Sequence, residues 1–338
     1  MSATATTTRE PMKAVVHHAY GSPDALDLGE IDKPVPAADE VLIKVHAAGL
    51  NAADRFLLRG EPYAIRAMAG GLRRPRANHV LGRAAAGLVE AVGEKVTGVR
   101  PGDAVYAECP GALAAYVCAP ERLVAPMPTT LTFEQAAAIP VAATAALQGL
   151  RDRGQVRPGQ RVLINGASSG VGTFAVQIAA SLGAHVTAVC GGRNADLVGS
   201  IGADHVIDYT KEDFTRAGQR YDVIFDLIGN HPVSALRRTL SPAGTLVLSS
   251  GGGGRWLGPA RRIAASLLVS PFVRQRLRPF AAKVDRADLL ALNDLVESGA
   301  VTPVIQHVYP FGEALEAMRQ IDGGHTTGKI VVRLLPSP

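Results

Sequence analysis

Cysteine is scarce in this chain of 338 residues, which contains Cys109, Cys118 and Cys190 and no others. These three form neither a Cys-x-x-Cys pair nor an even set, so the sequence offers no disulfide framework and fits a reducing compartment. A catalytic zinc needs three protein ligands, typically cysteine and histidine, and a structural zinc needs four clustered thiolates. Because no four-cysteine lobe lies between Gly102 and Ala115, we expect no metal site.

Long apolar runs are also missing. No uninterrupted apolar stretch reaches the roughly 18 residues that a membrane-spanning helix needs. The polar, threonine-rich stretch from Ser2 to Thr8 has no apolar core and does not resemble a secretory signal. With 47% hydrophobic residues, the chain can still form a full core. We therefore expect a globular, cytoplasmic protein.

Aromatic residues make up only 5% of the chain, and they are not interleaved with its basic residues. The net charge of +5 comes mostly from arginines in the ranges 55–76 and 255–286. A nucleic-acid-binding protein would combine such a charge with a recognition helix, interleaved aromatics or a basic arm. We therefore favour a solvated basic face together with phosphate binding, and we expect no nucleic-acid partner.

Glycine is abundant, and one glycine-rich stretch organises the chain. The short apolar run 162–164 predicts a strand buried on both faces, and the apolar positions from Val171 to Leu182 recur at helical spacing. A helix that starts directly after a glycine turn presents free N–H groups to a pyrophosphate. In the register of the Gly-x-Gly-x-x-Gly fingerprint the chain has Ala167, Ser169 and Gly172, and such turns also occur without ligands. The predicted cofactor-binding residues of the turn are Ser168, Ser169, Gly170, Val171 and Gly172.

The residues after the next strand favour NADPH. His185 to Cys190 is the predicted strand, and Gly191, Gly192 and Arg193 come directly after it. An NAD-binding protein would have an acid here for the ribose 2′-hydroxyl, whereas an arginine suits a 2′-phosphate. Since no carboxylate succeeds this strand, we predict NADPH as the cofactor. The alternative is that Arg193 is an ordinary surface arginine.

The two halves of the chain differ in the predicted order of their strands and helices. Before residue 132 the sequence predicts short strands separated by proline and glycine turns, with a short helix at 51–59. Thr132 and Gln135 then resemble a capping box before an alanine-rich helical stretch at 136–150. From Arg161 strands and helices alternate, as in a doubly wound parallel sheet. The strands predicted there are 161–165, 185–190, 205–208, 221–226 and 244–249.

The chain as a whole resembles the zinc-independent quinone oxidoreductase branch, of the zeta-crystallin type, of the medium-chain dehydrogenase/reductase superfamily. The resemblance runs from end to end and keeps the family's order of motifs. Where the zinc-dependent relatives place Gly-His-Glu, this chain has Gly82, Arg83 and Ala84. The other motifs include Asn51 to Asp54, Pro101-Gly102-Asp103, Gly166 to Gly172, Asp208-Tyr209 and Gly328-Lys329.

The resemblance implies an α/β protein with two domains. A GroES-like β-rich catalytic domain would span 1–134 and be completed by 303–338, and a Rossmann domain that binds NADPH would span 135–302. The active site would be the cleft between them. The family commonly pairs through its cofactor domains, so we expect a homodimer and a small-molecule substrate.

The roles of individual residues rest on the resemblance and on their chemistry. Asn51 could donate from its amide to a substrate carbonyl or to the cofactor ribose. By resemblance, Thr144 would lie by the nicotinamide carboxamide, unless its hydroxyl bonds back to its own helix. Tyr63 is a candidate proton donor, with simple packing as the alternative. The resemblance also puts Tyr209 and Arg193 beside the adenosine phosphate and His325 near the cofactor, although His325 could equally be a surface residue.

These residues predict an NADPH-dependent, zinc-independent oxidoreductase that reduces quinones or α,β-unsaturated carbonyl compounds by hydride transfer. Three departures support an alternative. Close relatives carry an aspartate at position 84, a small hydroxyl residue at 191 and often asparagine at 227, where this chain has Ala84, Gly191 and Leu227. The alternative is an NADPH-binding protein without redox activity, such as a scaffold, a sensor or a biosynthetic cyclase or isomerase.

The apolar segment 256–273 carries Arg261 and Arg262 and comes after four glycines. It could lie on a membrane surface to reach lipophilic quinones. We favour instead a lid or a subunit contact that buries its apolar residues.

Overall fold

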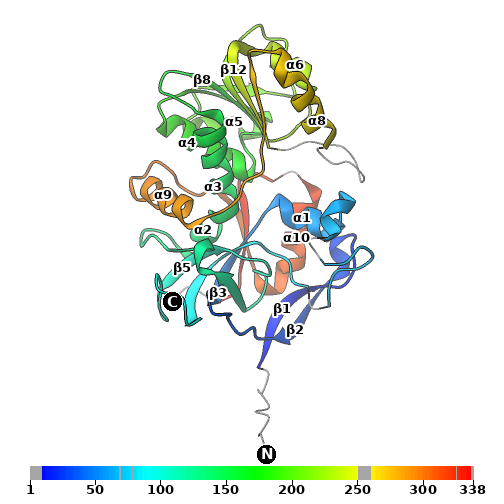
Figure 1. Ribbon diagram of the computed structural model, residues 1–338, viewed down its shortest axis with the longest axis vertical. Helices are drawn as coiled ribbons and strands as arrows, with labels where there is room; N and C mark the ends of the chain where they lie inside the picture. Colours follow the sequence, from blue (N-terminus) through cyan, green and yellow to red (C-terminus); the bar gives the residue numbers. More distant parts are fainter. Residues whose placement is uncertain (1–9, 68–69, 78, 250–259, 325, 336–338) are drawn as a thin grey trace, which may run out of the picture.

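The computed structural model describes residues 10–67, 70–77, 79–249, 260–324 and 326–335. Its strands form two large sheets, one in each half of the molecule, and helices α2 and α3 lie between the halves (Figure 1). The predicted α/β class is confirmed. We call the two parts the parallel-sheet half and the β-rich half.

The parallel-sheet half contains six strands in the order β10-β9-β8-β11-β12-β13, and every pair of neighbours is parallel. The chain starts at β8, winds outward in one direction, and then returns to wind outward in the other. This is the doubly wound order, in which ligands bind where the direction reverses, at the carboxyl ends of the strands. The strands are β8 (Arg161–Asn165), β9 (His185–Cys190), β10 (His205–Asp208), β11 (Tyr221–Asp226), β12 (Leu240–Leu248) and β13 (Arg276–Pro279).

Helices cover this sheet, and the sequence pattern explains why the central strands are inside. Val162, Leu163 and Ile164 of β8 are fully buried, as expected of an uninterrupted apolar run with helices on both faces. Phe174 and Ile178 of α4 are also fully buried. The helices of this half are α4 (Gly170–Ser181), α5 (Ala195–Ser200), α6 (Val233–Arg238), α8 (Ala260–Val269) and α9 (Arg286–Glu297).

The β-rich half contains a seven-stranded sheet, and the last strand of the chain is part of it. β15 (Lys329–Arg333) pairs antiparallel with β3 (Glu40–Leu50), so the two ends of the chain meet in one sheet. The path is β14-β15-β3-β4-β5-β7, and β6 pairs with β3. Its other strands are β4 (Ala84–Val92), β5 (Ala104–Glu108), β6 (Tyr116–Pro120), β7 (Val124–Pro126) and β14 (Ile305–Pro310), while β1 (Pro11–His17) and β2 (Leu26–Asp32) form a separate pair.

The helices between the halves differ from the single stretch predicted at 136–150. The capping box is confirmed, because the Thr132 side chain accepts a hydrogen bond from the Gln135 N–H and the Gln135 side chain accepts one from the Thr132 N–H. The helix then breaks, and Pro140, which has no N–H to donate, starts a new one. The resulting elements are α2 (Phe133–Ala137), α3 (Pro140–Leu147) and a π-helix at Gln148–Gly154.

Two further helices, α1 (Ala52–Arg59) and α10 (Ala314–Gly323), pack against each other in the β-rich half (Figure 1). The sequence predicted α1, as the short helix at 51–59. It missed the strands β2, β7, β13 and β14. β7 and β13 have only three and four residues, β2 contains three carboxylates, and polar residues interrupt the apolar pattern of β14. Short 3-10 helices complete the fold at Pro23–Ala25, Tyr63–Ala67, Glu121–Leu123, Gly192–Asn194, Ser270–Phe272 and Phe311–Glu313.

Part of the segment predicted as a lid, subunit contact or membrane contact lies outside the described residues, namely 256–259. The described part forms α8 and the turn after it, and in this single chain Leu267, Leu268 and Phe272 are exposed. Among the described helices, none is long and apolar enough to cross a bilayer. The burial of these side chains by a lid or a subunit contact therefore stays a prediction.

Candidate active site

The predicted glycine turn connects β8 to α4. Gly166 has a φ of +93°, which favours glycine, and a Cβ added to Gly172 would lie 2.1 Å from the carbonyl oxygen of Gly166. Ser169 is the N-cap of α4, and its hydroxyl accepts a hydrogen bond of 3.1 Å from the Gly172 N–H. The turn therefore requires glycine at position 172 and presents the first N–H groups of α4 at the carboxyl edge of the sheet.

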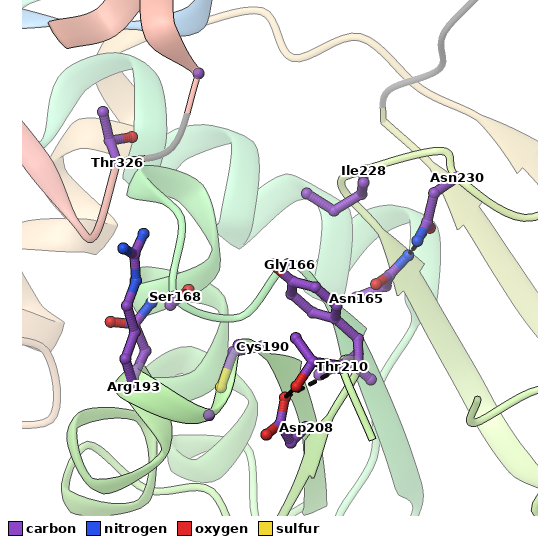
Figure 2. Close-up of a pocket in the computed structure, with 16 residues that line it drawn as sticks. Asn165, Gly166, Ser168, Cys190, Arg193, Asp208, Thr210, Ile228, Asn230 and Thr326 are labelled. Carbon is purple, nitrogen blue, oxygen red and sulfur yellow. Dashed lines mark hydrogen bonds between the residues drawn. The ribbon is translucent and has the colours of Figure 1, made fainter. Parts of the chain in front are cut away.

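A crevice of about 670 Å³ opens at this edge, and we call it the nucleotide crevice. Figure 2 shows Arg193 reaching along one side toward Ser168, with Thr326 above them. Tyr209, of which 59% is exposed, also lines the crevice. Asn194 holds the turn by donating from its side chain to the Ser168 hydroxyl over 3.1 Å. The structure thus brings together Ser168, Arg193 and Tyr209, three of the residues predicted to bind the cofactor.

The crevice also contains a carboxylate, which corrects the expectation that none is available near the ribose position. Asp208 ends β10, directly beside Cys190 at the end of β9, and lines the crevice with Arg193. Its Oδ1 accepts hydrogen bonds from the N–H and the hydroxyl of Thr210 (Figure 2). These bonds, above all the one from the Thr210 hydroxyl, lower the pKa of Asp208. The sequence analysis named Asp208 as part of a family motif but gave it no role, because it looked for a carboxylate only among the residues directly after β9 in the chain.

The glycine turn is attached to the C-terminal strand. The Gly328 N–H donates to the Ser168 carbonyl oxygen over 2.8 Å, and Ser169 and Gly328 form an isolated parallel bridge. A Cβ on Gly170 would lie 3.0 Å from Cδ of Lys329. Lys329 therefore lies against the start of α4, where the sequence analysis assigned it no role.

Lys329 fixes Asn51. Its ammonium group donates to the Asn51 side-chain oxygen over 2.6 Å and to the Leu50 carbonyl oxygen over 2.5 Å. The Asn51 amide in turn donates to the Gly49 carbonyl oxygen over 2.9 Å. Because an amide nitrogen carries two N–H groups, a second N–H of Asn51 can donate to a ligand. Burial lowers the pKa of Lys329 to about 8, and the charge of Asp54 opposes this effect.

Asp54 connects the start of α1 to the next segment. Its carboxylate is fully buried and accepts hydrogen bonds from the N–H of Asn51, over 2.8 Å, and from the N–H of Gly82, over 3.0 Å. Burial raises its pKa to about 6, against the effect of these two bonds and of the Lys329 charge. Asn51 is the N-cap of α1. By accepting both bonds, Asp54 fixes the position of Asn51 relative to Arg83, the residue after Gly82.

A second cavity of about 510 Å³ lies between the halves, and we call it the cleft. Ala53, Arg83 and Glu108 line it from the β-rich half, and Val141, Arg262 and Phe280 line it from the other. Glu108 lies directly opposite Ala84 in the β4–β5 pair and accepts a hydrogen bond from the Arg83 guanidinium. Although Ala84 lacks a side-chain carboxyl group, the neighbouring strand supplies one to the cleft. No pattern in the sequence signals this pairing.

The predicted residues Thr144 and Tyr63 differ in their surroundings. Thr144 is fully buried, and among the described residues its hydroxyl has no hydrogen-bond partner, so it does not bond back to its own helix. Tyr63 packs in the 3-10 helix at 63–67 with the Arg66 guanidinium 4.4 Å from its ring centre, and it is not among the described residues that line the cleft. His325 lies outside the described residues.

Within the part of the chain that the structure describes, no group of three or more His, Cys, Asp or Glu side chains could hold a metal ion. The side chain at position 83 is a guanidinium, which cannot ligate zinc. The residues present therefore do not fit a catalytic zinc.

Comparisons with known proteins agree with this geometry. Residues 37–129 match the family model of the alcohol dehydrogenase GroES-like domain, and residues 201–332 match the model of the zinc-binding dehydrogenase. The quinone oxidoreductase homolog of spinach (Spinacia oleracea) chloroplasts is 32% identical over 95% of this chain and 98% of its own. The chain belongs to the quinone oxidoreductase branch of the medium-chain dehydrogenase/reductase superfamily.

Two further members of the superfamily extend the comparison. A chloroplastic NADPH-dependent alkenal/one oxidoreductase of Arabidopsis thaliana is 33% identical over 96% of this chain and 80% of its own. The solved structure of the quinone oxidoreductase from Coxiella burnetii superposes with a TM-score of 0.85 at 28% identity, covering 96% of this chain and all of the other. This oxidoreductase thus has the GroES-like and Rossmann parts of the superfamily.

Proposed function

We propose that this oxidoreductase transfers a hydride from NADPH to quinones or α,β-unsaturated carbonyl compounds, without zinc. The observation that carries the proposal is the nucleotide crevice, in which Ser168, Arg193 and the N-terminus of α4 lie together at the carboxyl edge of a parallel sheet. Backbone N–H groups at a helix start bind pyrophosphate, and a guanidinium binds a further phosphate. The activity named for the Arabidopsis relative supports the same function.

The residues present fit a dinucleotide. The turn leaves no room for a Cβ at Gly172, so its backbone can approach phosphate oxygens closely. In α3, the buried Thr144 hydroxyl has no partner among the described residues. Because burying an unpaired hydroxyl is unfavourable, a group such as the nicotinamide carboxamide would satisfy it.

The choice between NADPH and NADH depends on two opposite charges in the crevice. Arg193 attracts a 2′-phosphate, whereas Asp208 would repel it and could accept a hydrogen bond from a ribose hydroxyl. Asp208 Oδ1 is already engaged by Thr210, which leaves the exposed Arg193 guanidinium as the group better able to reach the nucleotide. We therefore favour NADPH.

When bound, the reduced nicotinamide supplies a hydride to the electrophilic carbon of the substrate. In an unsaturated carbonyl substrate the π electrons then shift to give an enolate with its charge on the carbonyl oxygen, and a proton from solvent adds to the carbon next to the carbonyl to complete the reduction. The second N–H of Asn51 holds that oxygen as charge develops on it. Lys329 and Asp54 fix Asn51 from both sides, so the donor is oriented before the substrate arrives.

The test is stopped-flow measurement of NADPH oxidation with a panel of enones and quinones. We expect substrate-dependent oxidation with at least one class, and a slower rate for Asn51→Ala because a donor to the developing oxyanion is lost, by about 100-fold. Absence of turnover across the panel would contradict the proposal. If NADPH still bound tightly while a product of unchanged oxidation state accumulated, the non-redox alternative would be favoured.

A further inference from the structure

The cleft has an uneven distribution of charge. Most of the side chains that line it are apolar, including Val141, Ile263 and Phe280. Three ionisable side chains are the exceptions: Arg83, Glu108 and Arg262. Two of these are guanidiniums and one is a carboxylate, so the described lining carries more positive than negative groups.

The two guanidiniums come from opposite walls. Arg83 precedes β4, and 32% of its side chain is exposed, whereas 13% of the Glu108 side chain is exposed. Among the bonds between described residues, one from Nη2 to Glu108 is the only side-chain hydrogen bond of Arg83. Since a guanidinium carries donors along two edges, Arg83 retains N–H groups for a ligand.

Arg262 extends from α8 on the parallel-sheet side, and its counter-charge lies behind it. Its Nη2 is 2.6 Å from Oδ2 of Asp226, which is fully buried and is not part of the cleft lining. The same nitrogen donates to the His231 carbonyl oxygen over 3.2 Å. The bond to Asp226 anchors the guanidinium, while the neutralising carboxylate stays out of the cleft.

We propose that the cleft selects substrates that carry a carboxylate next to the electrophilic double bond, and that Arg83 is the residue that recognises this carboxylate. The proposal rests on the proposed function, because it names the class of substrate for the same site. Apolar walls cannot solvate a carboxylate, so its binding requires a charged partner inside the cleft. A guanidinium matches a carboxylate with paired hydrogen bonds. Glu108 positions Arg83 and also competes with the substrate for it.

The kinetic test uses a matched pair of compounds, trans-4-oxopent-2-enoate and its methyl ester, with saturating NADPH. Wild-type enzyme should have the lower KM for the acid. Arg83→Gln should raise the KM for the acid by about 10- to 100-fold, the loss expected for a hydrogen-bonded charge, and leave the KM for the ester nearly unchanged. Arg83→Lys should recover part of the effect because it restores the charge without the paired geometry.

Glu108→Gln provides a prediction of opposite sign. The amide keeps an acceptor for Arg83 but removes the competing negative charge, so the KM for the acid should fall below that of wild type. Arg122→Gln is the matched control, since Arg122 is exposed in the 3-10 helix at 121–123 and lines none of the described cavities. It removes the same charge from the same half of the molecule and should leave both KM values unchanged.

A binding measurement separates this inference from the proposed function. Calorimetric titration of the saturated acid 4-oxopentanoate needs no turnover, and its affinity should fall in Arg83→Gln while the affinity for NADPH stays constant. Acid binding that depends on Arg83, without reduction of any substrate, would support the cleft assignment and contradict the proposed function. Equal KM values for acid and ester, or acid binding unaffected by Arg83→Gln in a variant that keeps the wild-type Tm, would overturn the assignment.

Discussion

The nucleotide crevice and the cleft are built in opposite ways. Most of the crevice is formed by segments at one edge of one sheet, with Gly324 and Thr326 added from the segment between α10 and β15. Its central feature is the backbone of a glycine turn, which presents the first N–H groups of α4. The cleft takes its charged groups from β5, α8 and the loop before β4, so its chemistry depends on single side chains. A site built from backbone groups is disrupted most when a side-chain atom is added, whereas a site built from side chains is disrupted most when a charged group is removed.

The largest effect should come from an added methyl group in the crevice. Gly172→Ala would put a Cβ 2.1 Å from the Gly166 oxygen. Because the turn must open to relieve this contact, we expect the unfolding free energy to fall by about 4 kcal/mol. We also expect nucleotide binding to be lost. Urea denaturation and calorimetry with NADPH would measure both.

Gly199→Ala is the control for that variant. Gly199 lies in α5, and an added Cβ would meet no atom within 4 Å. Alanine there should raise the unfolding free energy by about 0.5–1 kcal/mol, because it restricts the unfolded chain and suits a helix. If Gly172→Ala and Gly199→Ala changed the unfolding free energy equally, the glycine turn would be no more sensitive to an added Cβ than an ordinary helix.

The next effect concerns Asp54, which links the start of α1 to the segment that carries Arg83 into the cleft. Asp54→Ala would leave the N–H groups of Asn51 and Gly82 without their acceptor. We expect a loss of about 3 kcal/mol of unfolding free energy, since two buried donors become unpaired. The loss of NADPH affinity should be smaller than in Gly172→Ala. If Asp54→Ala kept the wild-type unfolding free energy, water would replace the carboxylate, and its bonds to Asn51 and Gly82 would contribute little to stability.

A smaller effect is expected in the crevice from a removed charge. Arg193→Gln should weaken NADPH binding by about 2 kcal/mol, the value of a hydrogen-bonded charge, and change NADH binding little. Asp208→Asn should act in the opposite direction by weakening NADH relative to NADPH. Exposed Arg220 provides the control, as Arg220→Gln. If Arg193→Gln changed the two affinities equally, the preference for NADPH would have to originate elsewhere.

The smallest effect is a dependence on pH. Burial lowers the pKa of Lys329 to about 8, so above this pH the folded state releases a proton that the unfolded chain keeps until about 10.4. Between these values the unfolded state binds more protons, and stability rises with pH. Relative to Lys329→Met, wild type should therefore gain about 1 kcal/mol per pH unit in this window. Parallel stability curves for the two proteins would show that the pKa of Lys329 is unperturbed.

Local patterns were enough for much of the fold. The strands of the parallel sheet were predicted because uninterrupted apolar runs at 162–164 and in β11 indicate strands buried on both faces. The edge strand β13, Arg-Leu-Arg-Pro, was not predicted, because a strand with one covered face and two arginines has no such run. The helix 136–150 was predicted as one piece, and Pro140 divided it.

Within the site, the chain by itself determined the residues whose role depends on their neighbours in sequence. Ser168 to Gly172 form the turn because the order of strand, glycine and helix is local, and Arg193 comes after its strand for the same reason. Asp208 beside Arg193, Glu108 opposite Ala84, and Lys329 against Asn51 were decided only by tertiary structure. Each of these pairs joins different elements, and sequence spacing contains no information on the register of a sheet or on the closing of two halves around a cleft.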